Sequence, residues 1–150
     1  MSRGSWAKRN EWDDRNSYLF GINASYFRAD AASVYIPVAG SIAENPDPAS
    51  AVTQFIPGGS GRLVSLTTYC ASGTAPGSTV IKLNQMGPGE LGAKTISIAS
   101  QTIENFTFRD ELTSGTFEWD INDGTSLGIQ FNPTNNHDNM NVFALFEIYR

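Results

Sequence analysis

The sequence predicts an all-β protein, built as a single antiparallel β-sandwich with a jelly roll as the leading topology. Its 150 residues fit one domain whose core is large enough to fold without disulfides. Charged residues make up only 17% of the chain, and Gly, Ser, Thr, Asn and Ala fill the difference. That composition favours short strands joined by tight turns over helices, which need Leu, Glu, Lys and Arg.

Short apolar runs bounded by turn residues predict the strands in order along the chain. Pro37 lies inside the run at 33–38, so that run is expected at a sheet edge or as a strand start. A second run follows at 51–56. The remaining strands are expected at 62–70, 78–85, 94–99, 102–108, 116–121, 125–131 and 140–149. Gly-, Pro- and Asn-rich turns separate them, which is typical of a sandwich.

Two of these runs carry more specific predictions. In 116–121, Phe117 and Trp119 share one face of a strand, and the turn Asn122-Asp123-Gly124 that follows predicts a hairpin with the next run. In 140–149 both alternating sets of side chains are largely apolar. We therefore expect the last strand to be covered on both faces, centrally in the sandwich or between subunits.

Residues 1–32 are predicted to form an N-terminal docking arm in front of a sandwich at 33–150. The segment shows no sustained periodicity, yet it is rich in aromatic residues, unlike a disordered tail. Its rings either pack on the chain's own core or fill pockets on a partner, as aromatic interface residues do. We favour the second interpretation. Together with the outer side of the last strand, the predicted partner-interface residues are Trp6, Trp12, Tyr18, Phe20, Tyr26, Phe27, Phe143, Leu145 and Tyr149.

The charge distribution argues against nucleic acid as a partner. Residues 1–28 hold five basic and three acidic residues, whereas the rest holds five basic and twelve acidic ones. An acidic body binds phosphate backbones poorly, but a weakly basic arm can dock on an acidic neighbour, including a second copy of the chain. Without an apolar h-region at the start or an apolar run of about 20 residues, we expect no signal peptide and no membrane contact, and synthesis in a cytosol.

Patterns that resemble catalytic or cofactor sites have simpler explanations. Gly87, Gly89 and Gly92 match a dinucleotide-binding spacing, but the residues after them predict a strand, and the phosphate site needs a helix N-terminus. His137 lies in an Asn- and Asp-rich loop and is expected to be solvated. Cys70 is expected to be a buried thiol.

The acidic residues near position 120 also suggest no site. Glu118 and Asp120 alternate along one strand face, as a glycosidase pair would, but a solvated strand face explains them as well. Gly124 falls where a calcium loop needs an oxygen ligand. We therefore expect no enzyme activity, no cofactor, no metal site and no catalytic residue; a small hydrolase is the least favoured alternative.

The C-terminal part of the chain resembles a known family. The stretch from Gly115 to Thr134, with Phe117-Glu118-Trp119-Asp120 and Asn122-Asp123-Gly124, and the closing run from Asn141 to Tyr149 resemble small jelly-roll proteins of tailed-bacteriophage virions. The resemblance covers residues 60–150 and is one of overall pattern. It implies trimers, no enzymatic activity and a position on the outside of the particle, as in capsid decoration (cement) proteins, head fibres and collar or tail-fibre modules.

These observations lead to one favoured function and one alternative. The favoured hypothesis is a virion structural protein, a capsid decoration or cement subunit. It docks through its arm on the major capsid protein or another virion protein, and it forms homotrimers through its sandwich. The alternative is a receptor- or glycan-binding module of a phage fibre or collar.

Overall fold

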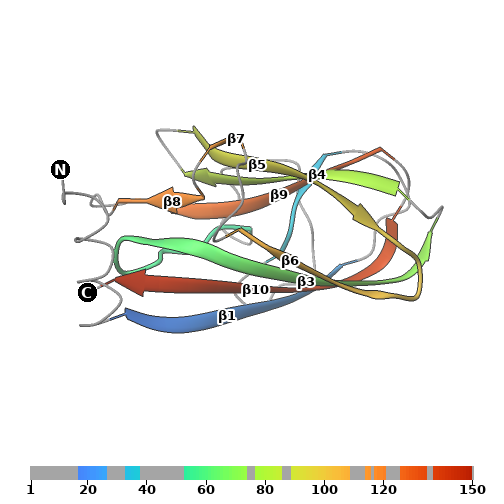
Figure 1. Cartoon of the computed structure of the whole chain (residues 1–150), viewed down its shortest axis with the longest axis horizontal. Helices are drawn as coiled ribbons and strands as arrows, with labels where there is room; N and C mark the ends of the chain where they lie inside the picture. The colour runs from blue at the N-terminus through green and yellow to red at the C-terminus, as the bar shows by residue number, and fades with distance from the viewer. Residues whose placement is uncertain are drawn as a thin grey trace, which may run out of the picture.

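The computed structural model describes residues 17–26, 33–37, 53–73, 77–85, 89–108, 114–115, 117–120, 126–134 and 137–149. All regular structure in these ranges is β-strand, and every strand pair is antiparallel. Two sheets face each other, so the predicted all-β sandwich is confirmed (Figure 1). The jelly-roll topology stays a prediction.

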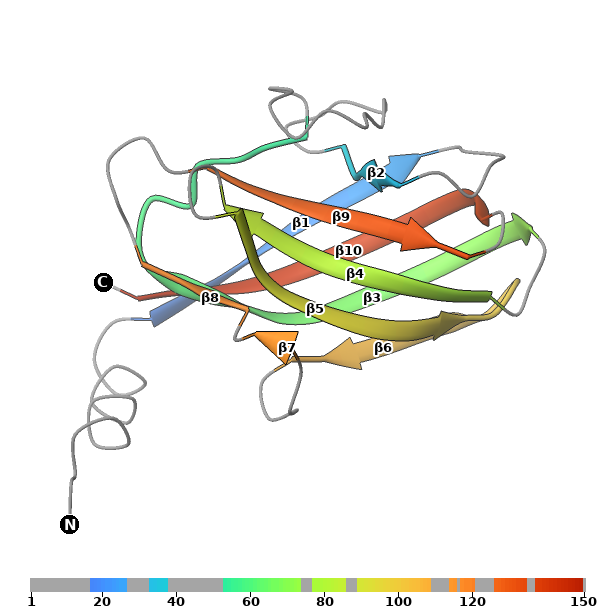
Figure 2. The same ribbon diagram turned by 90° about the horizontal axis from the view of Figure 1, so that it is seen from above.

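Sheet A takes the order β1-β10-β3-β6, with the short β8 also paired to β3. Its strands are β1 (Ser17–Tyr26), β3 (Gly61–Gly73), β6 (Ile103–Thr107), β8 (Glu118–Trp119) and β10 (His137–Tyr149). Sheet B takes the order β2-β9-β4-β5-β7. Its strands are β2 (Val34–Tyr35), β4 (Gly77–Gln85), β5 (Gly89–Ile98), β7 (Ser114–Gly115) and β9 (Leu127–Pro133). Seen from above, the strands of sheet B cross over those of sheet A (Figure 2).

Alternation along the long strands builds the core between the sheets. In β4 every second residue, from Gly77 to Gln85, is buried, and the residues between them are half-buried. In β10 the buried apolar set is Met140, Val142, Ala144, Phe146 and Ile148. Because side chains alternate across a strand, each sheet presents one apolar face to the other and leaves the second face outside. One core therefore holds the two sheets together.

The predicted boundary of the docking arm at residue 32 is wrong for residues 17–26. This segment is β1, and it pairs with β10 in continuous register from Ser17 opposite Tyr149 to Tyr26 opposite Met140. Its inner-facing residues Phe20 and Ile22 pack against the core. The strand was missed because Gly21 and Asn23 interrupt the apolar pattern on its outer side. The arm prediction for residues 1–16 and 27–32 lies outside the described residues.

The predicted hairpin around Asn122-Asp123-Gly124 is also wrong. β8 pairs with β3 in sheet A, whereas β9 pairs with β2 and β4 in sheet B. Of the expected strand at 116–121, the described residues 117–120 contain only the two-residue strand β8, and Phe117 before it adopts a left-handed backbone (φ 49°) and is buried. The Trp119 indole also lies in the core and donates from Nε1 to the Gly59 carbonyl at 2.7 Å. Burial of the Phe117 and Trp119 rings therefore determines the strand pairing here, and not the hairpin-type sequence at 122–124.

The prediction that no helix follows the Gly87-Gly89-Gly92 pattern is confirmed. Gly89 and Gly92 lie within β5, and Gly89 has the positive φ of 87° that glycine tolerates. A Cβ on Gly92 would come within 2.9 Å of the Phe117 backbone nitrogen. The glycine is thus explained by close packing of β5 on the Phe117 segment.

A buried hydroxyl at Thr68 yields the first testable prediction. Thr68 lies in β3, is 1% exposed, and its Oγ1 has no hydrogen-bond partner among the described residues. Valine has nearly the same shape without the polar atom, so Thr68→Val should raise the free energy of unfolding by about 1 kcal/mol. Urea unfolding measures this. Thr67→Val is the control, because Thr67 donates to Asn105 Oδ1 at 2.6 Å on the outer face and should gain no stability. A loss of stability in Thr68→Val would contradict the assignment.

Candidate interaction surface

The outer face of sheet A is built from rows of side chains that cross four strands. In the order β6, β3, β10, β1, the strand register aligns Ile103, Tyr69, Asn141 and Ser25 in one row. The next row is Asn105, Thr67, Phe143 and Asn23, and the third is Thr107, Ser65, Leu145 and Gly21. None of these twelve residues carries a charge. We call this set, together with Leu19 at the β1 edge, the sheet A surface.

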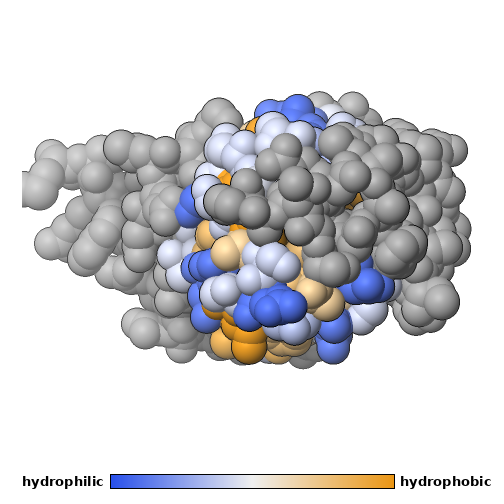
Figure 3. All heavy atoms as spheres, turned by 90° about the vertical axis from the view of Figure 1, so that its right-hand side faces the viewer, coloured by the Kyte–Doolittle hydropathy of each residue, from blue (hydrophilic) through white to orange (hydrophobic). Residues whose placement is uncertain are grey.

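Large apolar side chains are exposed on this surface and not on the opposite one. Leu19 is 59% exposed, Ile103 65%, Phe143 41% and Tyr69 36%. Among the described residues, the other exposed large hydrophobics are Tyr18, also in β1, and Ile56 in the segment before β3. In Figure 3 orange side chains gather along the lower edge, the side on which sheet A lies in Figure 1. Apart from Ile56, the exposed large hydrophobic residues among those described therefore belong to sheet A.

The outer face of sheet B has the character of a solvated surface. Lys82 of β4 and Glu90 of β5 form an ion pair with Nζ and Oε2 2.7 Å apart, both partly exposed. Thr95 and Ser97 of β5 are exposed on the same face. Exposed ion pairs of this kind add little stability and keep a surface hydrated. The two outer faces thus differ in chemistry, and only that of sheet A suits burial.

Side chains on the sheet A surface hold each other in place. The Phe143 ring lies over Gly21 of β1, where an added Cβ would meet its Cζ. Thr67 donates to Asn105 across β3 and β6, and Ser25 donates to Asn141 across β1 and β10. Side-chain pairs of this kind tie neighbouring strands together and reduce the mobility of the surface. A partner would consequently meet an ordered surface, which lowers the entropy cost of binding.

One end of the sheet A surface is closed by a buried ion pair. Arg62 of β3 donates from Nε to Glu147 Oε2 of β10 at 2.6 Å, and its Nη2 contacts the same oxygen. Both residues are about 5% exposed. The Arg62 guanidinium also lies 5.9 Å from the centre of the Tyr149 ring. Burial makes this pair costly to break from either side, because the remaining buried charge would lose its closest partner of opposite sign.

The structure divides the predicted interface residues into two groups. Phe143, Leu145 and Tyr149 lie on the outer side of β10, with Phe143 exposed and the other two half-buried. Phe20 instead points into the core, where its ring stacks on Phe146 at 5.1 Å and meets Phe55 edge-on at 5.9 Å. Phe20 therefore does not belong to the outer face of sheet A, unlike the three residues of β10.

The other predicted aromatic residues are placed only in part. Tyr18 is 40% exposed in β1, and Tyr26 ends that strand with a side chain that is not described. Trp6, Trp12 and Phe27 lie outside the described residues.

Sequence reasoning missed Leu19, Tyr69 and Ile103 as surface residues. Each was counted as a core residue of a strand or was not singled out, since an apolar residue in a strand is usually buried. A signal existed for Tyr69 and Ile103, which lie directly opposite each other in β3 and β6. Tyr69 alternates with the buried Leu66, Thr68 and Cys70 along β3, and Ile103 alternates with the half-buried Glu104 and Phe106 along β6. The parity could be read from the sequence, but the pairing of these strands could not.

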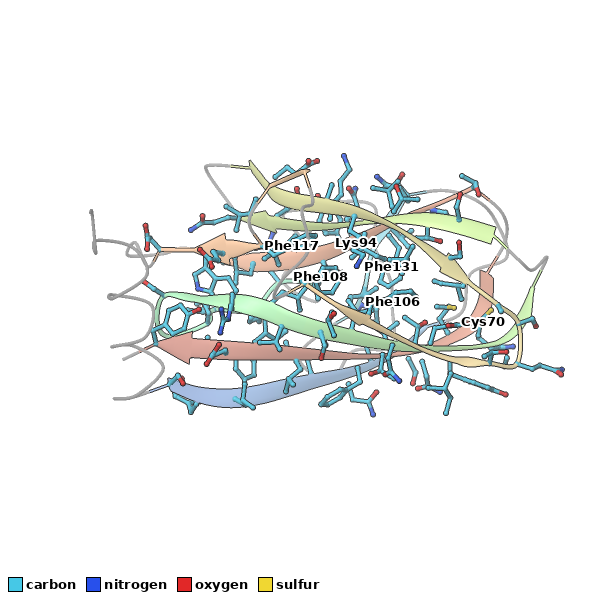
Figure 4. All side chains as sticks on the ribbon, viewed as in Figure 1. Cys70, Lys94, Phe106, Phe108, Phe117 and Phe131 are labelled. Carbon is cyan, nitrogen blue, oxygen red and sulfur yellow. The ribbon has the colours of Figure 1, made fainter. Side chains whose placement is uncertain are left out.

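Glu118 and Asp120, weighed above as a possible acidic pair, lie in the short strand β8 and directly after it. Glu118 lies opposite Arg62 in the β3–β8 pair, and the main-chain carbonyl of Asp120 accepts a hydrogen bond from Gln85. Lys94 of β5 points toward Phe108, 5.4 Å from Nζ to the ring centre, and donates to the Thr107 carbonyl at 3.1 Å (Figure 4). This lysine links the two sheets at the margin of the sandwich.

Two further features bear on the predicted absence of a site. Within the described ranges, no three His, Cys, Asp or Glu side chains lie close enough together to hold a metal ion. The His137 side chain is not described, and Cys70 is buried in β3. Nor does the part of the chain with described structure contain a helix long and apolar enough to cross a membrane.

Comparison with known proteins yields one remote structural likeness. No protein-family model matches the sequence, and neither does any curated protein. An arabinose-bound α-L-arabinofuranosidase resembles the chain with a TM-score of 0.40 and 14% identity. The likeness covers 83% of this chain and 25% of that enzyme, so the chain spans about a quarter of its length. At that score it carries no argument about function.

Proposed function

We propose that this protein is a non-enzymatic structural subunit that associates with copies of itself through the sheet A surface. The observation that carries the proposal is the asymmetry of the sandwich: Leu19, Tyr69, Ile103 and Phe143 are exposed on one outer face, while the other carries an ion pair. Clustered exposed apolar side chains mark surfaces that bind a partner. Because the surface is uncharged in a chain of net charge −5, two copies can meet there without like-charge repulsion.

Within this proposal the assembly is a virion, and the chain is a capsid decoration or cement subunit. The resemblance of residues 60–150 to jelly-roll virion proteins of tailed bacteriophages supports this step and implies three copies. The N-terminal segment, rich in aromatic residues and weakly basic, docks the subunit on the major capsid protein or another virion protein. Docking is assigned here to residues 1–16, because deleting further would remove β1 from sheet A.

Removal of two exposed rings tests the self-association step. The double variant Tyr69→Ser/Phe143→Ser should break the outer-face contact and lower the copy number, raising the dissociation constant of that contact at least a hundredfold, because central aromatic contacts dominate interface energies. Light scattering after size exclusion measures the mass. Ile56→Ser is the matched control, since Ile56 is 76% exposed but lies off the sheets. If the double variant and the control keep the same mass as the parent, the surface is not the interface.

Location on the particle needs a separate experiment. An antibody raised against the purified chain should label the outside of particles of the phage that encodes it. Particles carrying a chain without residues 1–16 should lose that label, while the isolated variant stays folded. Labelling that persists without these residues would remove the docking role, and absence of the chain from purified particles would remove the virion assignment.

A neutral glycan is the second candidate ligand for the same surface. Tyr69 and Phe143 offer exposed rings, and Asn23, Asn105 and Asn141 offer amides beside them. Rings that stack on sugar faces, with amides that bind hydroxyls, suit a receptor-binding module of a fibre or collar. A glycan array separates the candidates: specific binding that is lost in the double variant of a monomeric parent would favour the glycan.

A further inference from the structure

The outer edge of β1 is a strand edge of unusual length. β1 forms the end of sheet A, and its ten residues pair with β10 on one side only among the residues whose structure is described. The β1–β10 register runs without a bulge from the first to the last pair. An edge of this kind presents a row of backbone N–H and C=O groups to one side, a template for another strand.

β1 lacks the features with which proteins protect such edges. Its sequence, Ser17-Tyr18-Leu19-Phe20-Gly21-Ile22-Asn23-Ala24-Ser25-Tyr26, contains no charged residue and no proline. The opposite edge of sheet A, β6, is half as long and contains Glu104. Lys, Pro, bulges and short length are the usual means of preventing edge-to-edge pairing. β1 has none of the four, so pairing is permitted at this edge and opposed at the other.

The core under β1 is also incomplete. Phe20 and Ile22 point inward but are only half-buried, whereas their neighbours across the strand pair, Phe146 and Ala144, are fully buried. A further strand alongside β1 would cover the exposed sides of these two residues. On the outer side, Leu19 would be covered in the same way.

We propose that β1 pairs with β1 of a second copy of the chain, antiparallel and about a two-fold axis. This contact goes beyond the proposed function, because it uses the edge of sheet A and not its outer face. In an antiparallel pair, directly opposite residues lie on the same face of the sheet. A two-fold axis between two copies of β1 must therefore place one residue directly opposite the same residue of the second copy. With the axis at Gly21, Leu19 lies opposite the partner's Asn23, and Phe20 lies opposite the partner's Ile22.

That pairing has a clear structural consequence. The two A sheets become one continuous sheet, running β6-β3-β10-β1 in one copy and β1-β10-β3-β6 in the next. No like charges face each other, since the edge is uncharged. Isologous contacts of this type make the copy number even. If three copies also join through their outer faces, the complete oligomer contains six copies of the chain.

A charge placed on the β1 edge tests the contact. Tyr18 is 40% exposed in β1 and does not belong to the sheet A surface, so Tyr18→Lys places a charge at the edge without altering that surface. Thr95→Lys is the charge-matched control on the exposed side of β5 in sheet B. Solution mass is measured by light scattering, and amide hydrogen exchange is followed in a peptide covering residues 17–26. Thermal unfolding confirms that both variants are folded, and Ser17→Lys, also in β1 and outside the sheet A surface, provides a second edge variant.

The proposal predicts an even copy number for the parent and the Thr95→Lys control. Tyr18→Lys and Ser17→Lys should have half that mass, and their β1 amides should exchange at least tenfold faster. An odd copy number in the parent, or an unchanged mass in both edge variants, overturns the β1 pairing. If the edge variants keep the parent mass while Tyr69→Ser/Phe143→Ser lowers it, the edge contact is refuted and the proposed function stands.

Discussion

Replacing Phe146 by alanine should lower the free energy of unfolding by about 3–5 kcal/mol, the largest effect expected from a single truncation in this core. Phe146 is fully buried in β10. Its ring stacks on Phe20 at 5.1 Å and meets Phe55 and Trp119 edge-on at 4.9 and 6.0 Å. Truncation would leave a cavity among three rings that belong to separate segments of the chain. Urea-induced unfolding, followed by tryptophan fluorescence and circular dichroism, measures the change.

Phe143→Ala is the matched control for that experiment. It removes the same atoms from the same strand, but Phe143 lies on the outer face and is 41% exposed. Its loss exposes Gly21 and a small apolar area, so the monomer should lose less than about 1 kcal/mol. Equal effects of the two variants at monomer concentrations would show that the faces of β10 are assigned wrongly.

Replacing Glu147 by leucine should destabilise the fold by about 3–5 kcal/mol, because it leaves the Arg62 guanidinium buried without its carboxylate. The bond from Arg62 Nε to Glu147 Oε2 is 2.6 Å long, and both residues are about 5% exposed. Glu90→Leu is the exposed counterpart, since it breaks the Lys82–Glu90 pair at the surface of sheet B. An exposed pair contributes about 0–1 kcal/mol, so Glu90→Leu should have little effect.

A double variant separates the cost of an unpaired charge from loss of packing. Arg62→Met/Glu147→Leu removes both charges and keeps apolar volume, so it should regain most of the stability lost in Glu147→Leu. The measurement is a double-mutant cycle built from urea unfolding curves. If the double variant is no more stable than Glu147→Leu, the penalty does not come from the buried arginine.

Alternation of apolar residues predicted the strands of the sandwich where one face is buried. The run at 140–149 became β10, and the run at 78–85 became β4, with its buried set at every second residue. We predicted that both faces of β10 are covered. Within one chain only the inner face is covered, because Asn141 and Phe143 on the outer face are exposed. The strand is central in sheet A, as expected.

Features that depend on pairing between distant segments could not be predicted. Arg62 and Glu147 are 85 residues apart, and nothing in the local sequence of either indicates an ion pair. The turn at 122–124 has hairpin residues, yet β8 and β9 lie in different sheets. β1 resembled an arm because its outer side is interrupted by Gly21 and Asn23, and only the Phe143 ring across the strand pair explains the glycine.

The candidate interface was predicted in part for the same reason. Phe143 and Leu145 followed from the two-sided apolar pattern of the last strand. Tyr69 and Ile103 join them only because β3 lies between β10 and β6, which sets the rows across the sheet. The order of the strands decides which residues share the sheet A surface, and that order could not be predicted. The lack of charged residues in these strands can be seen in the sequence.

The mass of the purified full-length chain in solution, measured by light scattering after size exclusion, tests the central claim most directly. The account predicts a stable oligomer of the 16.3 kDa chain at micromolar concentration, and a smaller species in Tyr69→Ser/Phe143→Ser, which loses the outer-face contact. A parent protein that is monomeric at every concentration, with Leu19, Tyr69, Ile103 and Phe143 left in water, would contradict self-association through sheet A.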